Sequence, residues 1–236
     1  MQLTEPTRPE AAAGNRPRFT AKGLATRQRI IEGAADEVRE QGVPATRLED
    51  VLSRTSTSKS QLFHYFPGGK DDLLLAVAEY EADRVLADQQ PYLGDLTSWP
   101  QWTAWREAVL ARYREQGTAC PLGTLISHLG RATPGTRAIT ARLLADWQGH
   151  IARGVRAMQE QGEISALVDA DEASAALLAG IQGGVTILMS TGSLTHLQAA
   201  LDFTVSGLRL ARSTEFRAGV PARSPSSTPA AARRRS

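Results

Sequence analysis

The stretch that decides the fold is TRLEDVLSRTSTSKSQLFHYFPGGKDDLL, residues 46–74. Apolar residues recur at the spacing of one helix face over residues 47–54, and Ser/Thr residues at 55–57 then interrupt the pattern. A second short helix follows over residues 58–66 and ends before Pro-Gly-Gly. Two short helices joined by a three-residue turn predict a helix-turn-helix unit.

Both helices begin with the pattern of a capping box, in which two side chains three residues apart bond to each other's backbone. Thr46 and Glu49 form this pattern for the first helix, and Ser58 and Gln61 form it for the second. An isolated helix of two turns is unstable in water, so the second helix must pack on the rest of its domain.

The second helix carries more polar and aromatic side chains than packing alone requires. Leu62 and Phe66 form the face that would pack on the domain. In a helix-turn-helix unit this helix enters the major groove of DNA with its N-terminal residues first. The remaining faces carry the side chains that we expect to meet DNA: Lys59, Gln61, His64 and Tyr65.

Each expected contact has a chemical reason. A lysine suits a phosphate or a guanine edge, a glutamine pairs with adenine, and imidazole or phenol donates to phosphate. Backbone N–H groups at helix starts also bind phosphate, and Thr46 and Lys70 would add side-chain donors there. Three alternatives stay open: Gln61 only closes its capping box, His64 is partly packed, and Lys70 is simply solvated.

The composition is that of an ordinary globular protein, with 42% hydrophobic and 22% charged residues among 236. The single cysteine, Cys120, excludes an internal disulfide and fits a reducing compartment. The first residues lack the apolar segment of a secretory signal, so we expect a cytoplasmic protein. The apolar stretch 173–190 approaches the length of a membrane span. Because Gln182, Thr186 and Ser190 interrupt it, we expect a helix buried in protein and no membrane partner.

The net charge of +2 hides an asymmetry along the chain. Residues 1–70 carry 11 Lys/Arg against 8 Asp/Glu, residues 71–211 carry 10 against 16, and residues 212–236 carry 6 against 1. Basic ends joined to an acidic middle indicate that the ends bind a polyanion. An ordinary solvated surface is the alternative explanation.

Helical periodicity extends through the rest of the chain, without a strand pattern of period two. We expect an all-α protein with a three-helix N-terminal helix-turn-helix domain followed by a helical domain. The expected divisions are a disordered basic arm at 1–20, a DNA-binding domain at 21–72, a helical domain at 73–212 and a disordered basic tail at 213–236. The expected helices span about 24–41, 47–54, 58–66, 70–89, 101–117, 121–130, 134–161, 170–191 and 194–212.

Residues 26–75 resemble the DNA-binding domain of the TetR family of bacterial repressors. The resemblance rests on the order and spacing of TRQRIIEGAADEVREQG, ATRLEDVLSRTSTSKSQLFHYF and the lysine that opens the next helix. FPGGKDDLL, and CPLGTLISHLG at 120–130, are similar to the LmrA/YxaF-like subgroup. The resemblance implies a homodimer that binds a palindromic operator on double-stranded DNA, by family base rate as a repressor. It adds Thr57, Ser58 and Phe63 to the expected DNA contacts.

Two places depart from the family pattern. Ser56 stands in the turn where the family usually has glycine, and a serine held in the left-handed conformation there costs roughly 1 kcal/mol. The family's Tyr-x-His-Phe run is replaced by Phe63-His64-Tyr65-Phe66, so Phe63 offers an apolar contact and Tyr65 stands where histidine is usual. The family's base preferences are therefore not transferable.

The resemblance also implies that the helical domain binds a small-molecule effector. Such sites are mostly apolar with a few placed polar groups, so an apolar or aromatic effector is expected. The candidate residues are Trp102, Trp105, His128, Trp147, Gln182 and Met189. His128 and Gln182 are the stronger candidates, because a buried polar side chain needs a partner. Ordinary core packing is the alternative for each tryptophan.

Small residues at four-residue spacing occur on the last two expected helices, and they permit close approach of other helices. Two such helices from each subunit would form a four-helix dimer interface. The small residues at this spacing are Ala176, Gly180, Gly184, Ala199 and Gly207, and the larger Phe203 occurs at the same spacing. Packing of these faces within one subunit is the alternative.

Enzymatic activity, a cofactor and a metal site are not expected. Cys120 and His128 lack a third group to orient them as nucleophile and base. PGGK lacks the preceding strand and the following Ser/Thr of a phosphate loop. The acidic residues at 169–172 suit a helix N-terminus rather than a metal. The remaining rival is a helical protein-interaction module without specific DNA binding. A DNA-binding regulator and a protein-interaction module differ in salt dependence, because the affinity of a protein for DNA falls steeply as the salt concentration rises.

Overall fold

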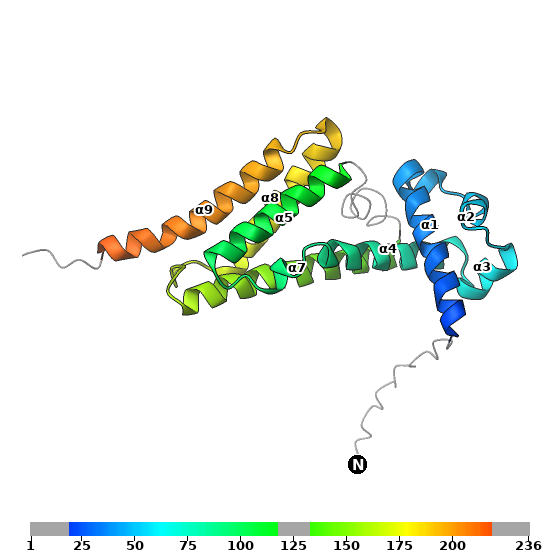
Figure 1. The fold of residues 1–236 in the computed structure, drawn as a ribbon, viewed down its shortest axis with the longest axis horizontal. Coiled ribbons are helices and arrows are strands. Elements are labelled where there is room, and N and C mark those ends of the chain that lie inside the picture. Colours follow the sequence, from blue (N-terminus) through cyan, green and yellow to red (C-terminus); the bar gives the residue numbers. More distant parts are fainter. Residues whose placement is uncertain (1–18, 118–132, 219–236) are drawn as a thin grey trace, which may run out of the picture.

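The computed structural model describes residues 19–117 and 133–218, with side chains as far as residue 211. Every regular element in these ranges is helical, which confirms the expected all-α class (Figure 1). The helix expected at 121–130 lies outside the described residues, as do Cys120 and His128. The elements are α1 (Ala21–Ala45), α2 (Leu48–Thr55), α3 (Lys59–Tyr65), α4 (Lys70–Ala87), the 3-10 turn η1 (Tyr92–Gly94), α5 (Trp99–Gln116), α7 (Pro134–Glu160), α8 (Ala170–Thr191) and α9 (Thr195–Ala218).

The helices α1, α2 and α3 form the N-terminal domain around one small core. Ile30 and Val38 of α1, Val51 of α2, and Leu62 and Phe66 at α3 are all buried. Helix α3, which is too short to be stable alone, is therefore held by the apolar face that the sequence predicts.

Helix α1 differs from the expected helix at both ends. Thr20, which falls within the expected arm at 1–20, caps the helix by accepting a hydrogen bond from the backbone N–H of Gly23. Gly42, the expected end, leaves the helical conformation with φ 76°, and one more turn follows to Ala45. Glycine adopts this positive φ without the steric cost that a side chain would add.

Helix α4 connects the N-terminal domain to the remaining helices, which we call the body. It extends from the α1–α3 unit into the body (Figure 1), and it packs against both α1 and α7. Arg112 and Gln116 of α5 donate hydrogen bonds to the Asp88 carboxylate, which directly follows α4. Any movement of α4 therefore changes contacts in both parts of the molecule.

In the body, α8 packs between α7 and α9. Gly184 of α8 lies against the backbone of Leu197 on α9, where a Cβ atom would come within 2.5 Å of the Leu197 Cα. Helix α8 is also the one described helix long and apolar enough to cross a membrane by length and composition. Only 39% of its most apolar window is buried, so the expected burial within protein is incomplete in a single chain.

Candidate functional site

The turn between α2 and α3 has the backbone conformation that the resemblance to the TetR family predicts. Ser56 has φ 48° and ψ 46°, which is the left-handed conformation that the family fills with glycine. Its N–H donates to the carbonyl of Ser53. Thr57 is buried, and its side-chain oxygen lies 3.0 Å from that of Thr55. The Thr57 hydroxyl thus supports the turn, and its DNA contact stays a prediction.

The capping box of α3 is present as expected. The N–H of Gln61 donates to Oγ of Ser58 at 3.2 Å, and the N–H of Ser58 donates to Oε1 of Gln61 at 3.1 Å. The side-chain Nε2 of Gln61 has no hydrogen-bond partner recorded among the described residues. Gln61 is exposed, so this donor group can reach an acceptor outside the chain.

The capping box expected for α2 is wrong. Arg47, not Thr46, occupies the N-cap position, and no side chain caps α2. Thr46 is buried, and its hydroxyl donates to the carbonyl of Gly42 at 2.8 Å. The break at Gly42 leaves that carbonyl available to Thr46, so the hydroxyl serves the end of α1 instead.

Helix α3 turns its polar residues outward. Leu62 is buried, whereas Lys59, Gln61 and His64 are exposed and Phe63 is 40% exposed. The exposed set contains a cation, an amide, an imidazole and an apolar ring. These are side chains that contact phosphates, base edges and thymine methyl groups.

An aromatic cluster holds one side of α3. Phe19 lies edge-on to His64 at 5.7 Å and to Tyr65 at 5.0 Å between ring centroids, and the His64 and Tyr65 rings are 4.9 Å apart. Tyr65 is half-buried in this cluster, which limits how far its ring reaches from the protein. His64 stays exposed although its ring is packed edge-on. The alternative that His64 is partly packed is therefore correct in part.

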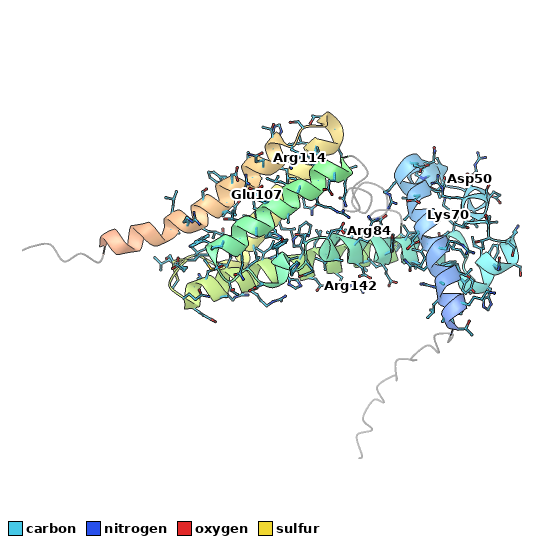
Figure 2. All side chains as sticks on the ribbon, viewed as in Figure 1. Asp50, Lys70, Arg84, Glu107, Arg114 and Arg142 are labelled. Atoms are coloured by element: carbon cyan, nitrogen blue, oxygen red, sulfur yellow. The ribbon has the colours of Figure 1, made fainter. Side chains whose placement is uncertain are left out.

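Lys70 has internal partners. Its ammonium donates to the backbone carbonyls of Thr46 at 2.6 Å and Val43 at 2.9 Å. These bonds tie the first turn of α4 to the end of α1 (Figure 2). Lys70 is therefore neither free nor simply solvated. An ammonium has three donors, so a phosphate contact at Lys70 stays a prediction.

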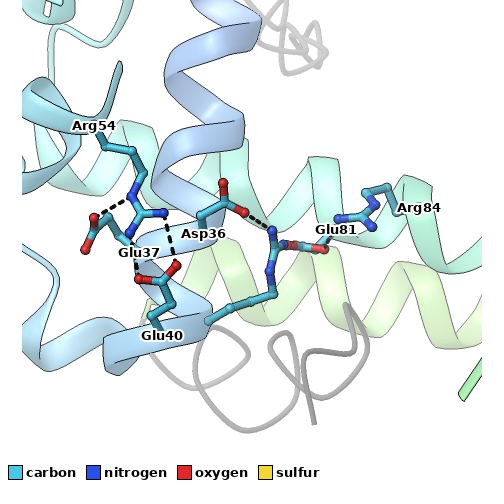
Figure 3. A network of polar contacts seen from close by, with 7 residues as sticks. Asp36, Glu37, Glu40, Arg54, Glu81 and Arg84 are labelled. Carbon is cyan, nitrogen blue, oxygen red and sulfur yellow. Dashed lines mark hydrogen bonds and ion pairs between the residues drawn. The ribbon is translucent and has the colours of Figure 1, made fainter. Parts of the chain in front are cut away.

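Two groups of ion pairs hold α1 against α2 and α4 (Figure 3). Arg54 of α2 binds the carboxylates of Glu37 and Glu40 on α1, and these hydrogen bonds raise the pKa of Arg54. Arg39 of α1 binds the carboxylates of Asp36 and of Glu81 on α4. The α1–α2 unit therefore has polar links as well as an apolar core.

Two family models match this chain in the regions just described. One, described as bacterial regulatory proteins of the tetR family, matches residues 30–77, and the other, described as a tetracyclin repressor-like C-terminal domain, matches residues 101–204. The chain belongs to the TetR family. Its helix-turn-helix unit and its body thus correspond to the two parts that define TetR regulators.

Individual relatives agree with this assignment. The HTH-type transcriptional regulator Rv0196 of Mycobacterium tuberculosis is 29% identical over 110 residues, 44% of this chain and 53% of that protein. The match thus spans about half the length of that relative. The HTH-type regulator YxaF of Bacillus subtilis is 22% identical over 175 residues, 73% of this chain and 89% of YxaF. The similarity to YxaF agrees with the expected subgroup, which stays a prediction at this identity.

A solved TetR-like structure shares the fold. SmeT, the repressor of the multidrug efflux pump SmeDEF of Stenotrophomonas maltophilia, matches with a TM-score of 0.63 at 19% identity. The match covers 88% of this chain and 99% of SmeT.

The expected effector residues of this TetR protein divide into two groups. The indole N–H of Trp102 donates to the carbonyl of Leu96, and that of Trp105 donates to Oε1 of Gln89, each at 3.0 Å. Both tryptophans are fully buried in the core of the body, and their contact with an effector stays a prediction. By contrast, the buried N–H of Trp147 and the buried side-chain amide of Gln182 have no hydrogen-bond partner in the described structure. Met189 is half-buried beside the core.

The expected dimer residues also divide. Gly184 is buried against α9 of the same chain, and Gly180 is half-buried near Ala200. Gly184 therefore packs within one subunit, whereas a dimer contact of Gly180 stays a prediction. The exposed members are Ala176, Ala199, Phe203 and Gly207. Phe203 is 83% exposed, which is unusual for a phenylalanine and indicates a contact surface.

Several site residues are missing from the sequence interpretation. Phe19 lies in the stretch assigned to a disordered arm, although an aromatic residue directly before a capping threonine could have marked the start of the domain. Arg39 and Glu81 are 42 residues apart, and no local pattern links them. Among the described residues, no group of three His, Cys, Asp or Glu side chains is placed to hold a metal ion.

Proposed function

We propose that this protein is a cytoplasmic transcriptional repressor that binds a palindromic DNA operator as a homodimer and leaves it when a small-molecule effector binds. The proposal rests on the arrangement of α3, which packs on its domain through the buried Leu62. The same helix exposes the side chains of Lys59, Gln61, Phe63 and His64. A rigid helix with outward polar side chains is what direct reading of the major groove needs.

The exposed faces of α8 and α9 support the homodimer. Phe203 and Leu210 of α9 are 83% and 67% exposed. The neighbouring exposed positions of both helices are mostly small or apolar, which suits close helix packing. A second copy of the same face would bury them in a four-helix interface with twofold symmetry. Twofold symmetry in turn suits a palindromic operator.

The position of α4 supports release by an effector. Its first turn is bonded to α1 through Lys70, its middle through Glu81, and the residue after its end is bonded to α5 through Asp88. A ligand that displaced α4 within the body would therefore move the α1–α3 domain. The two α3 helices of a dimer must lie about 34–36 Å apart to enter successive major grooves, so a small displacement of either one would weaken operator binding. SmeT has been solved in complex with triclosan, which shows that one protein of this fold binds an aromatic compound.

A helical protein-interaction module is the rival function. It would use the same exposed residues of α3 for a protein partner. A protein contact of modest charge would change little with salt, whereas operator binding should weaken by orders of magnitude as salt rises.

The test is fluorescence anisotropy with labelled DNA from the region flanking the protein's own gene, in excess unrelated competitor and at two salt concentrations. Wild-type protein should bind tightly, and Lys59→Ala should weaken binding and lower the salt slope by about 1 per subunit. Arg142→Ala is the matched control, because Arg142 is exposed on α7 in the body (Figure 2). Equal binding to all DNA by wild type and Lys59→Ala would refute reading by α3.

The dimer has a separate test by light scattering. Phe203→Glu should give monomers and weaken operator binding, because it places charge in the proposed interface. Leu167→Glu is the control, because Leu167 is 86% exposed in the turn before α8. A dimeric Phe203→Glu protein would place the interface elsewhere.

A further inference from the structure

Two side chains of the body carry buried hydrogen-bonding atoms that have no partner in the described structure. They are the indole N–H of Trp147 on α7 and the side-chain amide of Gln182 on α8. Trp147 is fully buried, and both polar atoms of Gln182 are removed from solvent. The other such atom among the described residues, Oε2 of Glu81, still lies 3.7 Å from a guanidinium nitrogen of Arg84.

Such groups are costly to leave unpaired. A buried donor or acceptor without a partner costs about 1–3 kcal/mol, and native proteins contain few of them. Other buried polar side chains of the body have hydrogen-bond partners. The buried amide of Gln89 accepts from Trp105 and donates to the carbonyl of Val85, and Trp102 donates to Leu96. The unpaired groups of Trp147 and Gln182 therefore stand apart from a core that is otherwise satisfied.

Trp147 lies in the middle of a buried face of α7. Leu143 and Ile151, one turn before and one turn after it, are both buried. The indole N–H of Trp147 is removed from water, so it can be satisfied only by an acceptor that reaches it inside the body.

Gln182 interrupts an apolar stripe on α8. Leu178 and Val185 of this stripe are buried, Met189 is half-buried, and the spacing 178, 182, 185, 189 follows one helix face. A leucine at position 182 would continue the stripe and bury no unpaired amide. The amide in its place offers one acceptor and two donor hydrogens.

The described residues offer no buried charge to a ligand near these groups. The buried carboxylates are Glu37 and Glu81, and each is already paired with an arginine of the N-terminal domain. An ionised ligand group buried in the body would lack a counter-charge among them, which is strongly unfavourable. The arrangement favours an uncharged ligand.

We infer that the effector is an uncharged, largely apolar compound with a carboxamide or lactam group, anchored by the Gln182 amide and accepting a second hydrogen bond from Trp147. The inference rests on the proposed function for the existence of an effector. It adds the chemical class of that effector and the two side chains that select it. A carboxamide both donates and accepts, so it complements both ends of the Gln182 side chain.

Three probes of similar size test this class by calorimetric titration of the full chain without DNA. Benzanilide carries a neutral amide between two rings, trans-stilbene has the same shape without polar atoms, and 4-benzamidobenzoate adds a carboxylate. Wild-type protein should bind benzanilide at least about tenfold more tightly than either of the others. Equal affinity for benzanilide and stilbene, tighter binding of the carboxylate, or no binding of benzanilide would overturn the inference.

Two variants assign the preference to its residues. Gln182→Leu and Trp147→Phe should each lose most of the preference for benzanilide over stilbene. Without ligand, Gln182→Leu should also raise the thermal midpoint, because it removes a buried unpaired amide. Gln159→Leu is the matched control and should lower it, since its Nε2 donates to the carbonyls of Ser165 and Val168. A Gln182→Leu protein that keeps the preference, or that melts at lower temperature, contradicts the inference.

Operator binding separates this inference from the proposed function. If the protein binds its operator but the probes show no amide preference, the ligand class is wrong and the repressor stands. If the amide preference and its loss in Gln182→Leu are observed without any operator binding, the site stands and the repressor fails.

Discussion

Arg39 of α1 donates a hydrogen bond to the carboxylate of Glu81 on α4, and the Glu81 side chain is fully buried at this contact. Burial raises the pKa of Glu81, and the charge of Arg39 opposes that rise. The contact lies between the domain that would bind DNA and the helix that enters the body. Its ionisation therefore bears on the stability of that junction.

Glu81→Gln should remove a defined part of the pH dependence of stability. Because the pKa of Glu81 is raised in the folded state, the folded protein binds a proton more tightly than the unfolded chain does. The free energy of unfolding should therefore fall as pH rises from the ordinary glutamate pKa to the raised one. Urea denaturation across that range should show this slope in wild type and a shallower one in Glu81→Gln. Glu79→Gln, an exposed change on α4, should keep the wild-type slope.

Ser56→Gly should stabilise the protein by about 1 kcal/mol, because glycine adopts the left-handed conformation of Ser56 without steric cost. Chemical denaturation measures the change. Ser53→Gly is the matched control inside α2, where the same substitution should destabilise by up to about 1 kcal/mol. Destabilisation by both variants would show that the Ser56 side chain matters more than its backbone.

Phe19→Ala should weaken operator binding about three- to tenfold, because it removes edge-on contacts to His64 and Tyr65 that are worth about 0.5–1.5 kcal/mol per pair. The anisotropy titration measures the loss. Tyr92→Ala removes a partly exposed aromatic ring from η1 and should leave operator binding unchanged. Unchanged binding of Phe19→Ala would mean that the cluster does not position α3.

Gly184→Ala should destabilise the body by about 1–3 kcal/mol, because the added methyl group would overlap the backbone of Leu197. Thermal unfolding measures the shift. Gly149→Ala on α7 meets only the far end of the Arg153 side chain, so the better helix propensity of alanine should stabilise the protein slightly. A neutral Gly184→Ala variant would show that α8 and α9 separate easily.

The sequence predicts the parts of this fold that depend on local rules. The capping box of Ser58 and Gln61 follows from residue types at fixed spacing, and it is present. The left-handed conformation of Ser56, also present, follows from the resemblance to a family that usually has glycine at this position. The role of Thr46 as the cap of α2 is predicted wrongly. The break at Gly42 exposes a carbonyl that competes for its hydroxyl, and the sequence pattern does not report that competition.

Contacts between distant residues are beyond such rules. Lys70 bonds to carbonyls 24 and 27 residues earlier, so its commitment to α1 depends on how α4 meets that helix. The same holds for the effector candidates. All three buried tryptophans look alike in sequence, and only the packed body distinguishes Trp147, whose N–H is unpaired, from the two that have acceptors.

The capping box of α3 also limits how much sequence information Gln61 can extract from an operator. Pairing with adenine through two hydrogen bonds requires the amide oxygen to accept while the amide nitrogen donates. In this protein one lone pair of the oxygen accepts from the Ser58 N–H, so the cap restrains the orientation of the amide while the nitrogen keeps both donor hydrogens. Where only this nitrogen reaches a base edge, its donor is met equally by guanine, by the N7 of adenine and by the O4 of thymine. We therefore expect the base pair facing Gln61 to be among the most degenerate in an aligned set of natural half-sites.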